Sequence, residues 1–196
     1  MSPKQQRGEA TAAQVLDTAL ELYAAQGEAG LTLNAITSAS GVSAGSIYHH
    51  FGSLQGVVLA LAQSWLGRLL GEVVEALHQV TDARGGVRAL AETYLRFIQE
   101  HPDAARLMHS VTADREAITN ARQLRGAQEA RIAPLAAWLH AHQDSGELVA
   151  LPVPVLESLI LGPVTSIARR WLAVGDIDIE EAIRTVPDHI WRSVSS

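Results

Sequence analysis

Residues 31–51 read LTLNAITSASGVSAGSIYHHF, a segment that predicts two short helices joined by a tight turn. Thr32 can accept a hydrogen bond from a free backbone N–H at the start of the first helix, and Ser43 can do the same for the second. Gly41 stands where a chain leaving a helix needs the left-handed conformation. Apolar residues at helical spacing predict one buried side for each helix. These residues are Ala35, Ile36 and Ala39 in the first helix, and Ile47 and Phe51 in the second.

Small residues open the second helix and leave its amino end accessible. A capped second helix after a glycine turn is typical of the helix-turn-helix that enters a DNA major groove. The adjacent rings of Tyr48, His49 and His50 favour this interpretation over a plain three-helix packing unit, which is the alternative. The residues expected to contact DNA are Thr32, Ser43, Ala44, Gly45, Ser46, Tyr48, His49 and His50.

The same stretch resembles the signature of the TetR family of bacterial transcription regulators. The matching residues are Thr32, Ile36, Ala39, the Gly41-Val42-Ser43 triplet, Gly45, Tyr48 and His50-Phe51. The similarity is specific over about residues 10–60 and concerns only the order of helices beyond them. It implies an all-α fold of about nine helices. A three-helix helix-turn-helix DNA-binding domain (1–53) would precede a helical ligand-binding and dimerisation domain (54–196).

Composition limits the class of protein. A chain of 196 residues with 47% hydrophobic content is long enough for one or two domains with a substantial core. Without cysteine, disulfides and thiolate metal sites are excluded. No basic-then-apolar leader and no run of 18 apolar residues occurs, so we expect a cytoplasmic protein without membrane spans. The eight histidines form no recognisable ligand set, and we expect no metal and no cofactor.

Charge is unusual for a DNA-binding protein. The chain carries a net charge of −6, and residues 1–55 carry Lys4 and Arg7 against four acidic side chains. The second helix of the motif has no lysine or arginine, and Leu54 stands where the family commonly has lysine. DNA affinity draws heavily on phosphate neutralisation. We therefore expect a shallow salt dependence, with phosphate contacts from hydroxyls, imidazoles and helix amino ends.

Apolar periodicity predicts further helices on both sides of this motif. They span 9–26, 54–81, 87–100, 102–111, 116–144, 154–173 and 179–194, with a polar tail before residue 9, a loop at 82–86 and an extended connector at 146–154.

The last two helices (about 154–194) carry apolar stripes. Ile179, Ile183, Val186, Ile190 and Val194 nearly form a heptad seam, and Leu156, Leu159, Ile160, Val164, Ile167 and Trp171 mark the preceding helix. These stripes predict a homodimer through a four-helix bundle across a two-fold axis. The alternative is that they pack on the chain's own core.

The family resemblance implies a small-molecule effector among the middle helices. The residues that offer an apolar lining with a few polar tips are Trp65, Tyr94, Phe97, Met108, His109 and Trp138. For each of them ordinary core packing is the alternative. Arg106, Arg122 and His109 are candidates for holding an anionic group of the ligand.

These expectations describe a ligand-responsive DNA-binding transcription regulator. The resemblance implies a repressor that a small molecule releases from a palindromic double-stranded DNA operator. One alternative is a dimeric small-molecule-binding helical protein whose helix-turn-helix no longer binds DNA tightly. An all-α enzyme is disfavoured, because the chain has no phosphate-binding glycine loop, nucleophile elbow or paired carboxylates. We therefore expect no enzymatic activity.

Overall fold

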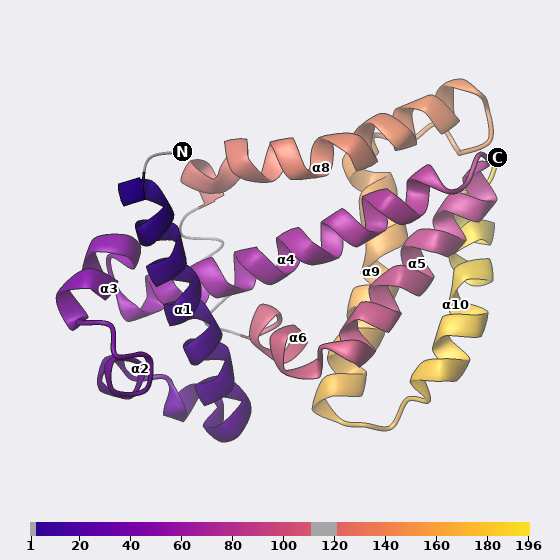
Figure 1. Cartoon of the computed structure of the whole chain (residues 1–196). Helices are drawn as coiled ribbons and strands as arrows, with labels where there is room; N and C mark the ends of the chain where they lie inside the picture. Colours follow the sequence, from indigo (N-terminus) through magenta and orange to yellow (C-terminus); the bar gives the residue numbers. More distant parts are fainter. Residues whose placement is uncertain (1–2, 111–120) are drawn as a thin grey trace. The chain divides into compact units, whose positions relative to one another are not determined.

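The computed structural model describes residues 3–110 and 121–196, with side chains described for 5–110 and 132–196. Over these residues the backbone forms nine α-helices, one 3-10 turn and no extended strand, which confirms the expected all-α class (Figure 1). The elements are α1 (Pro3–Gln26), η1 (Gly27–Gly30), α2 (Leu33–Ser40), α3 (Ala44–Phe51), α4 (Leu54–His78), α5 (Ala83–Glu100), α6 (Pro102–Met108), α8 (Ala121–Asp144), α9 (Val153–Ala173) and α10 (Ile179–Val194).

Contacts divide the chain into two compact units. Unit 1 comprises Met1–Leu66 and Asp103–Arg122, and unit 2 comprises Gly67–Pro102 and Gln123–Ser196. Helix α4 passes from unit 1 into unit 2 without a break. The sequence predicts a boundary after residue 53, between a DNA-binding domain and a ligand-binding and dimerisation domain. That functional boundary stays a prediction.

Unit 1 is built around the helix-turn-helix. Helices α1, α2 and α3 contact one another (Figure 1). Their apolar sides bury a core together with the first turns of α4 and with α6. The buried members are Val15, Ala19, Leu31, Ile36, Ile47, Val57, Val58, Leu61, Ala62 and Leu107.

The helix ends in unit 1 follow from local chemistry. Oγ1 of Thr32 accepts the Ala35 N–H at 3.1 Å, and Oγ of Ser43 accepts the Ser46 N–H at 3.3 Å. Gly41 adopts φ +69° between the two helices, a conformation that a side chain would strain. Ser53 caps α4 by accepting the Gly56 N–H at 2.9 Å. The caps at Thr32 and Ser43 and the turn at Gly41 confirm the sequence predictions.

Two sequence predictions about α1 and α2 are wrong. Helix α1 begins at Pro3 and not at Glu9, because proline suits the first helical position and the polar residues after it are good helix formers. Ala39 is exposed, whereas Ser40 is buried. Burial of Ser40 is tolerated because its hydroxyl donates to the Ile36 carbonyl at 2.6 Å and accepts the Val42 N–H at 3.1 Å.

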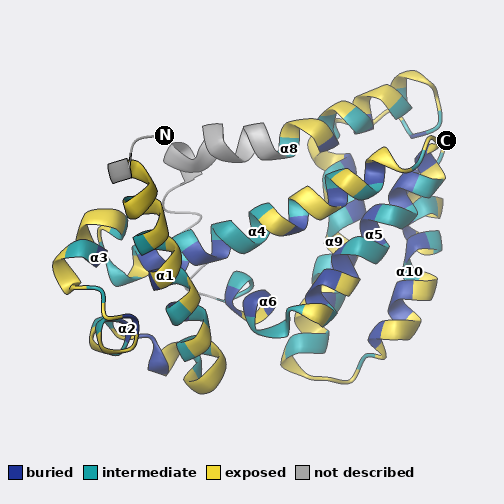
Figure 2. Cartoon of the chain, viewed as in Figure 1, coloured by how far each residue is buried: buried dark blue, intermediate teal, exposed yellow. Residues whose placement is uncertain are grey.

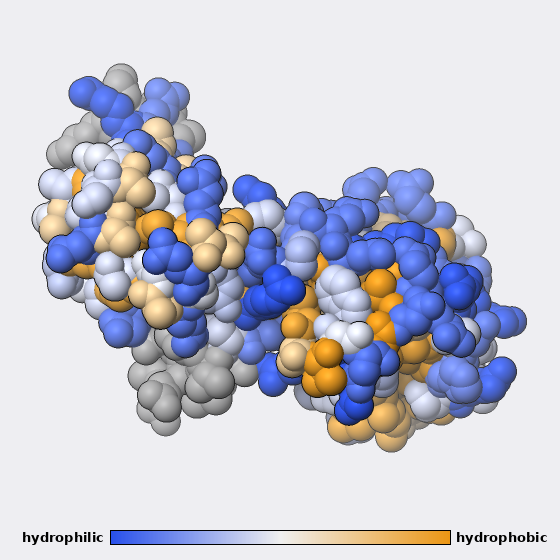
Figure 3. Space-filling view, turned by 90° about the horizontal axis from the view of Figure 1, so that it is seen from below, coloured by the Kyte–Doolittle hydropathy of each residue, from blue (hydrophilic) through white to orange (hydrophobic). Residues whose placement is uncertain are grey.

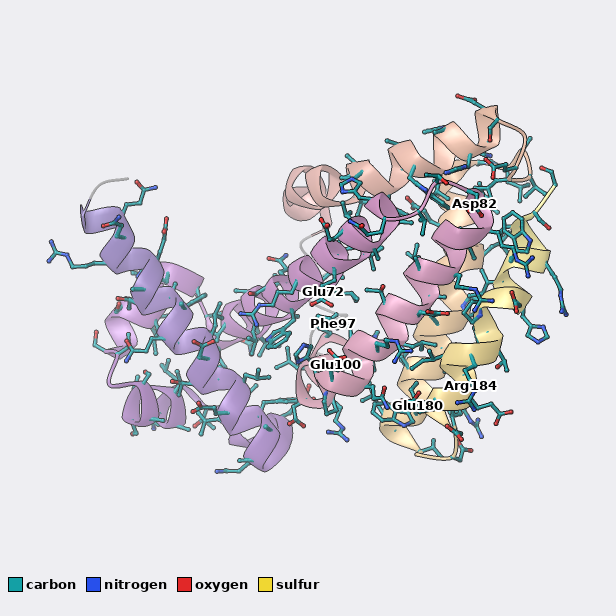
Figure 4. The ribbon with its side chains drawn as sticks, turned by 45° about the vertical axis from the view of Figure 1, so that its right-hand side comes forward. Glu72, Asp82, Phe97, Glu100, Glu180 and Arg184 are labelled. Carbon is teal, nitrogen blue, oxygen red and sulfur yellow. The ribbon has the colours of Figure 1, made fainter. Side chains whose placement is uncertain are left out.

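Unit 2 contains α5, α9 and α10, which contact one another and turn their buried sides inward (Figures 1 and 2). The loop expected at 82–86 is wrong, because α5 begins directly after Asp82. The Asp82 carboxylate accepts the Gly85 N–H at 2.8 Å and so caps the helix. Figure 4 shows Asp82 at the start of α5 and Phe97 near its other end.

Helix α8 meets the start of α5 through two contacts. The ring of Trp138 lies so close to Gly86 that a Cβ atom there would overlap it. Glu147, just after α8, accepts the Ala83 N–H at 2.9 Å. The first turn of α5 is thus held by one shape-dependent contact and one hydrogen bond.

The segment between α8 and α9 pairs with the residues after α10. Leu148 and Ser195 form an isolated antiparallel bridge, in which the Val149 N–H donates to the Val194 carbonyl at 2.9 Å. The Ser196 N–H donates to the Glu147 carbonyl at 3.3 Å. We refer to this pairing as the terminal bridge.

The apolar stripe of α10 packs inside its own unit. Ile179, Ile183, Ile190 and Val194 are all buried, and α10 contacts both α5 and α9. The alternative interpretation, core packing, is therefore correct for these four residues. Leu159 and Ile167 on α9 and Val186 on α10 are only partly covered.

Helix α4 is the one helix in the described ranges that is long and apolar enough to cross a membrane by length and composition alone. Its apolar residues Val57, Val58 and Leu61 lie in the core of unit 1, while Arg68 and Glu72 are exposed. This distribution is typical of an amphipathic core helix.

Candidate nucleic-acid interface

One side of α3 is open to solvent. Ala44, Gly45, Tyr48 and His49 are all exposed, and steps of about 100° per residue place them on one face. Tyr48 has 54% of its surface exposed, whereas Ile47 on the opposite face has 1%. Figure 2 shows this contrast between the outer and inner sides of α3. An exposed tyrosine on a helix fixed from behind can contact another molecule without refolding.

The amino end of α3 leaves room for a close approach. No atom lies within 4 Å of a Cβ built on Gly45, so the first turn is unobstructed. The side chain of Ser43 already accepts the Ser46 N–H, and its hydroxyl hydrogen can still donate. The same holds for Thr32 at the start of α2. Both hydroxyls are exposed and keep a hydrogen that they can donate.

All eight residues predicted to contact DNA lie in unit 1. Seven of them are exposed, and Ser46 is half-buried. They therefore lie at the surface of unit 1, and their contact with DNA stays a prediction.

The two histidines at the end of α3 lie together. Their ring centroids are 5.5 Å apart at an interplanar angle of 69°, an edge-to-face arrangement. A Cβ built on Gly8 would lie 3.6 Å from Cε1 of His50, so His50 faces the first turns of α1. Sequence reasoning missed this neighbour because it treated the first eight residues as a tail. The amphipathic pattern begins only after Glu9, so no periodic signal marks the earlier turns.

Electrostatics at this surface are weak. Helices α2 and α3 carry no carboxylate, lysine or arginine. On α1 the exposed Arg7 is followed by the exposed acids Glu9, Asp17 and Glu21. The side chain of Lys4 lies outside the described residues. The described interface thus offers hydroxyls, imidazoles and backbone N–H groups in place of a basic patch.

The residues predicted to line an effector pocket fall into both units. Tyr94, Phe97 and Trp138 belong to unit 2, and Trp65, Met108 and His109 belong to unit 1. Their assignment to one effector pocket stays a prediction.

Three of these residues have packing roles in unit 2. Phe97 has 1% of its surface exposed and packs edge-on against His101, with ring centroids 4.8 Å apart. Burial raises the pKa of Tyr94, whose hydroxyl lies 3.4 Å from Oγ1 of Thr165 on α9. Trp138 packs against His142, with ring centroids 4.6 Å apart.

The residues proposed for an anionic group have different environments. Arg106 forms an ion pair with Asp103 at 2.9 Å within α6. His109 is half-buried after the end of α6. The side chain of Arg122 lies outside the described residues.

Comparison with known proteins adds to this geometry. Residues 15–61 match the family model of bacterial regulatory proteins, tetR family. This range includes the second half of α1, all of α2 and α3, and the start of α4. The helix-turn-helix domain of this chain is therefore of the tetR family type.

Two curated relatives agree with this match. It is 34% identical over 80 residues to the transcriptional repressor KstR2 of Rhodococcus jostii, covering 41% of this chain and 39% of that protein. It is 32% identical over 95 residues to the transcriptional activator FasR of Mycolicibacterium smegmatis, covering 48% of this chain and 43% of that protein. The chain therefore spans about two fifths of the length of these relatives.

The whole chain shares its fold with solved structures. A TetR family transcription regulator from Marinobacter aquaeolei matches with a TM-score of 0.75 at 20% identity, over 98% of this chain and 99% of that chain. At this identity the similarity concerns the fold, including the helices that follow the matched domain.

Proposed function

We propose that this TetR-family chain is a ligand-responsive DNA-binding transcription regulator that acts as a homodimer on a palindromic operator. The observation that carries the proposal is the exposed face of α3, with Tyr48 at its centre, inside the domain that matches the family model. A short capped helix with an open amino end fits the major groove.

The residues of α3 favour a particular manner of recognition. Arginine and lysine most often recognise guanine through its O6 and N7 atoms, and α3 has neither. The Ala44 methyl can contact a thymine methyl, and Gly45 allows the backbone to approach the bases. Thr32 and Tyr48 would donate to phosphates, and these contacts fix the register on the duplex.

The proposed dimer uses the partly covered apolar surface between α9 and α10. A groove of about 470 Å³ lies there. Its lining consists of Ser158, Leu159, Pro163, Ile167, Val186, His189, Ile190 and Ser193. Figure 3 shows exposed apolar surface on unit 2, on the right of the view. A second copy of the chain would cover this groove and supply the second α3 helix for a second half-site.

A small-molecule effector would act by binding the DNA-incompetent state more tightly than the DNA-bound one. The candidate residues for contact with it are Tyr94, Phe97 and Trp138 in unit 2, and Trp65, Met108 and His109 in unit 1. Helix α4 joins the two units as one continuous helix, so an effector that acts on unit 2 has a direct covalent route to unit 1.

Repression is the proposed outcome of operator binding. Activation is the second candidate, because FasR, a relative of similar identity, is named an activator. A reporter gene behind the operator separates the two. Deleting the regulator raises expression if it represses and lowers expression if it activates.

The test is titration of an operator-length duplex taken from DNA upstream of the chain's own gene. The wild type should bind, and Tyr48→Ala should bind about ten-fold more weakly, because about 1.4 kcal/mol of contact energy corresponds to that factor. Stability should be unchanged, because Tyr48 is exposed. Val174→Ala is the matched control, since Val174 is an exposed apolar residue of unit 2 with 64% of its surface accessible.

Equal binding by Tyr48→Ala and the wild type would show that the α3 face is wrongly assigned. Absence of duplex binding even at low salt would favour the alternative, a dimeric small-molecule-binding protein.

A further inference from the structure

The scarcity of fixed positive charge is the starting point. Over residues 1–55 the sequence carries two basic side chains against four acidic ones, and α2 and α3 carry neither kind. Phosphate neutralisation supplies most non-specific DNA affinity. Apart from Lys4 and Arg7, a duplex therefore has to find its positive partners in this region among groups that are not permanently charged.

The imidazoles of His49 and His50 are the groups of that kind on α3. Both side chains are exposed, and they occupy the last turn of the helix. A positive charge at the carboxyl end of a helix is favoured by the helix dipole. Histidine is also the side chain whose charge ordinarily changes between about pH 5 and 8.

The geometry places the two rings at different edges of the same surface. His49 follows Tyr48 and Gly45 around the exposed side of α3, whereas His50 faces Gly8 on α1. Their ring centroids are 5.5 Å apart. Each ring nitrogen that carries a proton can donate to a phosphate oxygen.

The elements packed against α3 contribute few other charges. Helix α1 presents Arg7 and Glu9 on either side of Gly8, followed by Asp17 and Glu21. Helix α2 and the first turns of α4 carry no carboxylate, lysine or arginine. Tyr48 is the other titratable side chain on α3.

We propose that His49 and His50 bind operator phosphates as imidazolium cations, so that protons are taken up when the chain binds DNA. This inference rests on the proposed function and adds a dependence on pH. An anionic phosphate favours the charged form of an adjacent imidazole. The complex therefore holds more protons than the free protein, and affinity rises as pH falls through the range in which histidine titrates.

The test measures operator affinity at fixed ionic strength near pH 8, 7 and 6. We expect binding about ten-fold or more tighter near pH 6 than near pH 8, because one proton taken up changes affinity up to ten-fold per pH unit. The plot of log affinity against log salt should also steepen at low pH, by about 0.9 for each histidine that becomes a phosphate contact.

Variants assign the effect to the two rings. His49→Gln and His50→Gln should each reduce the pH dependence, and the double variant should remove it. His49→Arg should bind near pH 8 about as tightly as the wild type binds near pH 6, because its charge is permanent. His140→Gln, an exposed histidine of α8 in unit 2, is the matched control and should behave as the wild type.

The outcomes separate this inference from the proposed function. Absence of operator binding at every pH would contradict the proposed function itself. Operator binding that does not change between pH 8 and 6 would overturn only the role of the histidines. A pH dependence that survives in the double variant and disappears in His189→Gln would also overturn the role of His49 and His50. It would assign the proton uptake to the groove between α9 and α10.

Discussion

The Glu147 carboxylate accepts three hydrogen bonds. The donors are the Ala83 N–H at 2.9 Å, Nδ1 of His142 at 2.9 Å and the Ser145 hydroxyl at 3.0 Å. These donors hold the pKa of Glu147 below its ordinary value, and the Ala83 N–H has the largest effect. A single side chain thus joins the end of α8 to the start of α5.

Replacing Glu147 with glutamine should make the free energy of unfolding depend less on pH in the acid range. A carboxylate whose folded pKa is lowered stabilises the fold above the ordinary glutamate pKa of about 4.3. That contribution is lost as the pH falls from there through the folded pKa. Urea unfolding should therefore show Glu147→Gln less stable than the wild type at pH near 7, with the difference shrinking toward pH near 3.

The matched control is Glu72→Gln, which changes an exposed carboxylate on α4 (Figure 4). It should leave unfolding close to the wild type at both pH values. A stability difference for Glu147→Gln that stays constant with pH would contradict the role given to the carboxylate.

At the scale of the element, α3 depends on its cap. Ser43→Ala removes the acceptor for the Ser46 N–H and should lower the free energy of unfolding by about 1 kcal/mol. Ser43→Gly should cost only a few tenths of that, because glycine is tolerated at this position. Urea unfolding of both variants measures the difference. An alanine variant as stable as the wild type would show that the cap contributes nothing.

Features decided within a few residues could be predicted from the sequence. The caps at Thr32 and Ser43 and the left-handed Gly41 are of this kind, because each depends on one side chain and its own backbone. How far each residue is buried could be predicted less well. Ser40 is buried in place of Ala39, because the local hydrogen bonds of Ser40 make its burial tolerable.

Helix α10 shows a second limit of sequence reasoning. Its period shows that one side is apolar, but the period does not say what covers that side. In the structure α5 and α9 cover it. Ion pairs of Arg84 and Arg88 on α5 with Asp188 on α10, at 3.3 and 2.8 Å, add to this contact. No sequence pattern predicts these ion pairs, because they join residues far apart in the chain.

At the scale of the whole molecule, the groove between α9 and α10 should hold the dimer together. Ile167→Glu places a carboxylate in its apolar lining and should raise the dimer dissociation constant at least about ten-fold, because an unpaired charge is costly to bury. Sedimentation equilibrium measures the dissociation constant, and operator titration should show that the variant binds a two-half-site duplex more weakly than the wild type does, with binding to a single half-site unchanged.

Val174→Glu, at an exposed residue outside the groove, is the control and should remain dimeric. Val186→Glu provides a second variant on α10 if Ile167→Glu fails to fold. A dimer that withstands both groove variants, or a wild type that is monomeric at all concentrations, would contradict the proposed interface.

The effector site was the least predictable part of the candidate function. Tyr94 and Phe97 are buried among the helices of unit 2, and an apolar residue that fills a core has the same sequence pattern as one that lines a ligand. Met108 follows α5 closely in the sequence but belongs to the other unit. Only the contacts reveal that division.

The terminal bridge has a consequence for how the molecule opens. It joins the residues just before α9 to those just after α10, so the helical hairpin between them is tied at its base. The ends of a helix ordinarily fray and exchange their amide hydrogens early. Here the amide hydrogens of α9 and α10 should exchange together, as one cooperative unit. Deletion of the last two residues should allow α10 to fray from Val194.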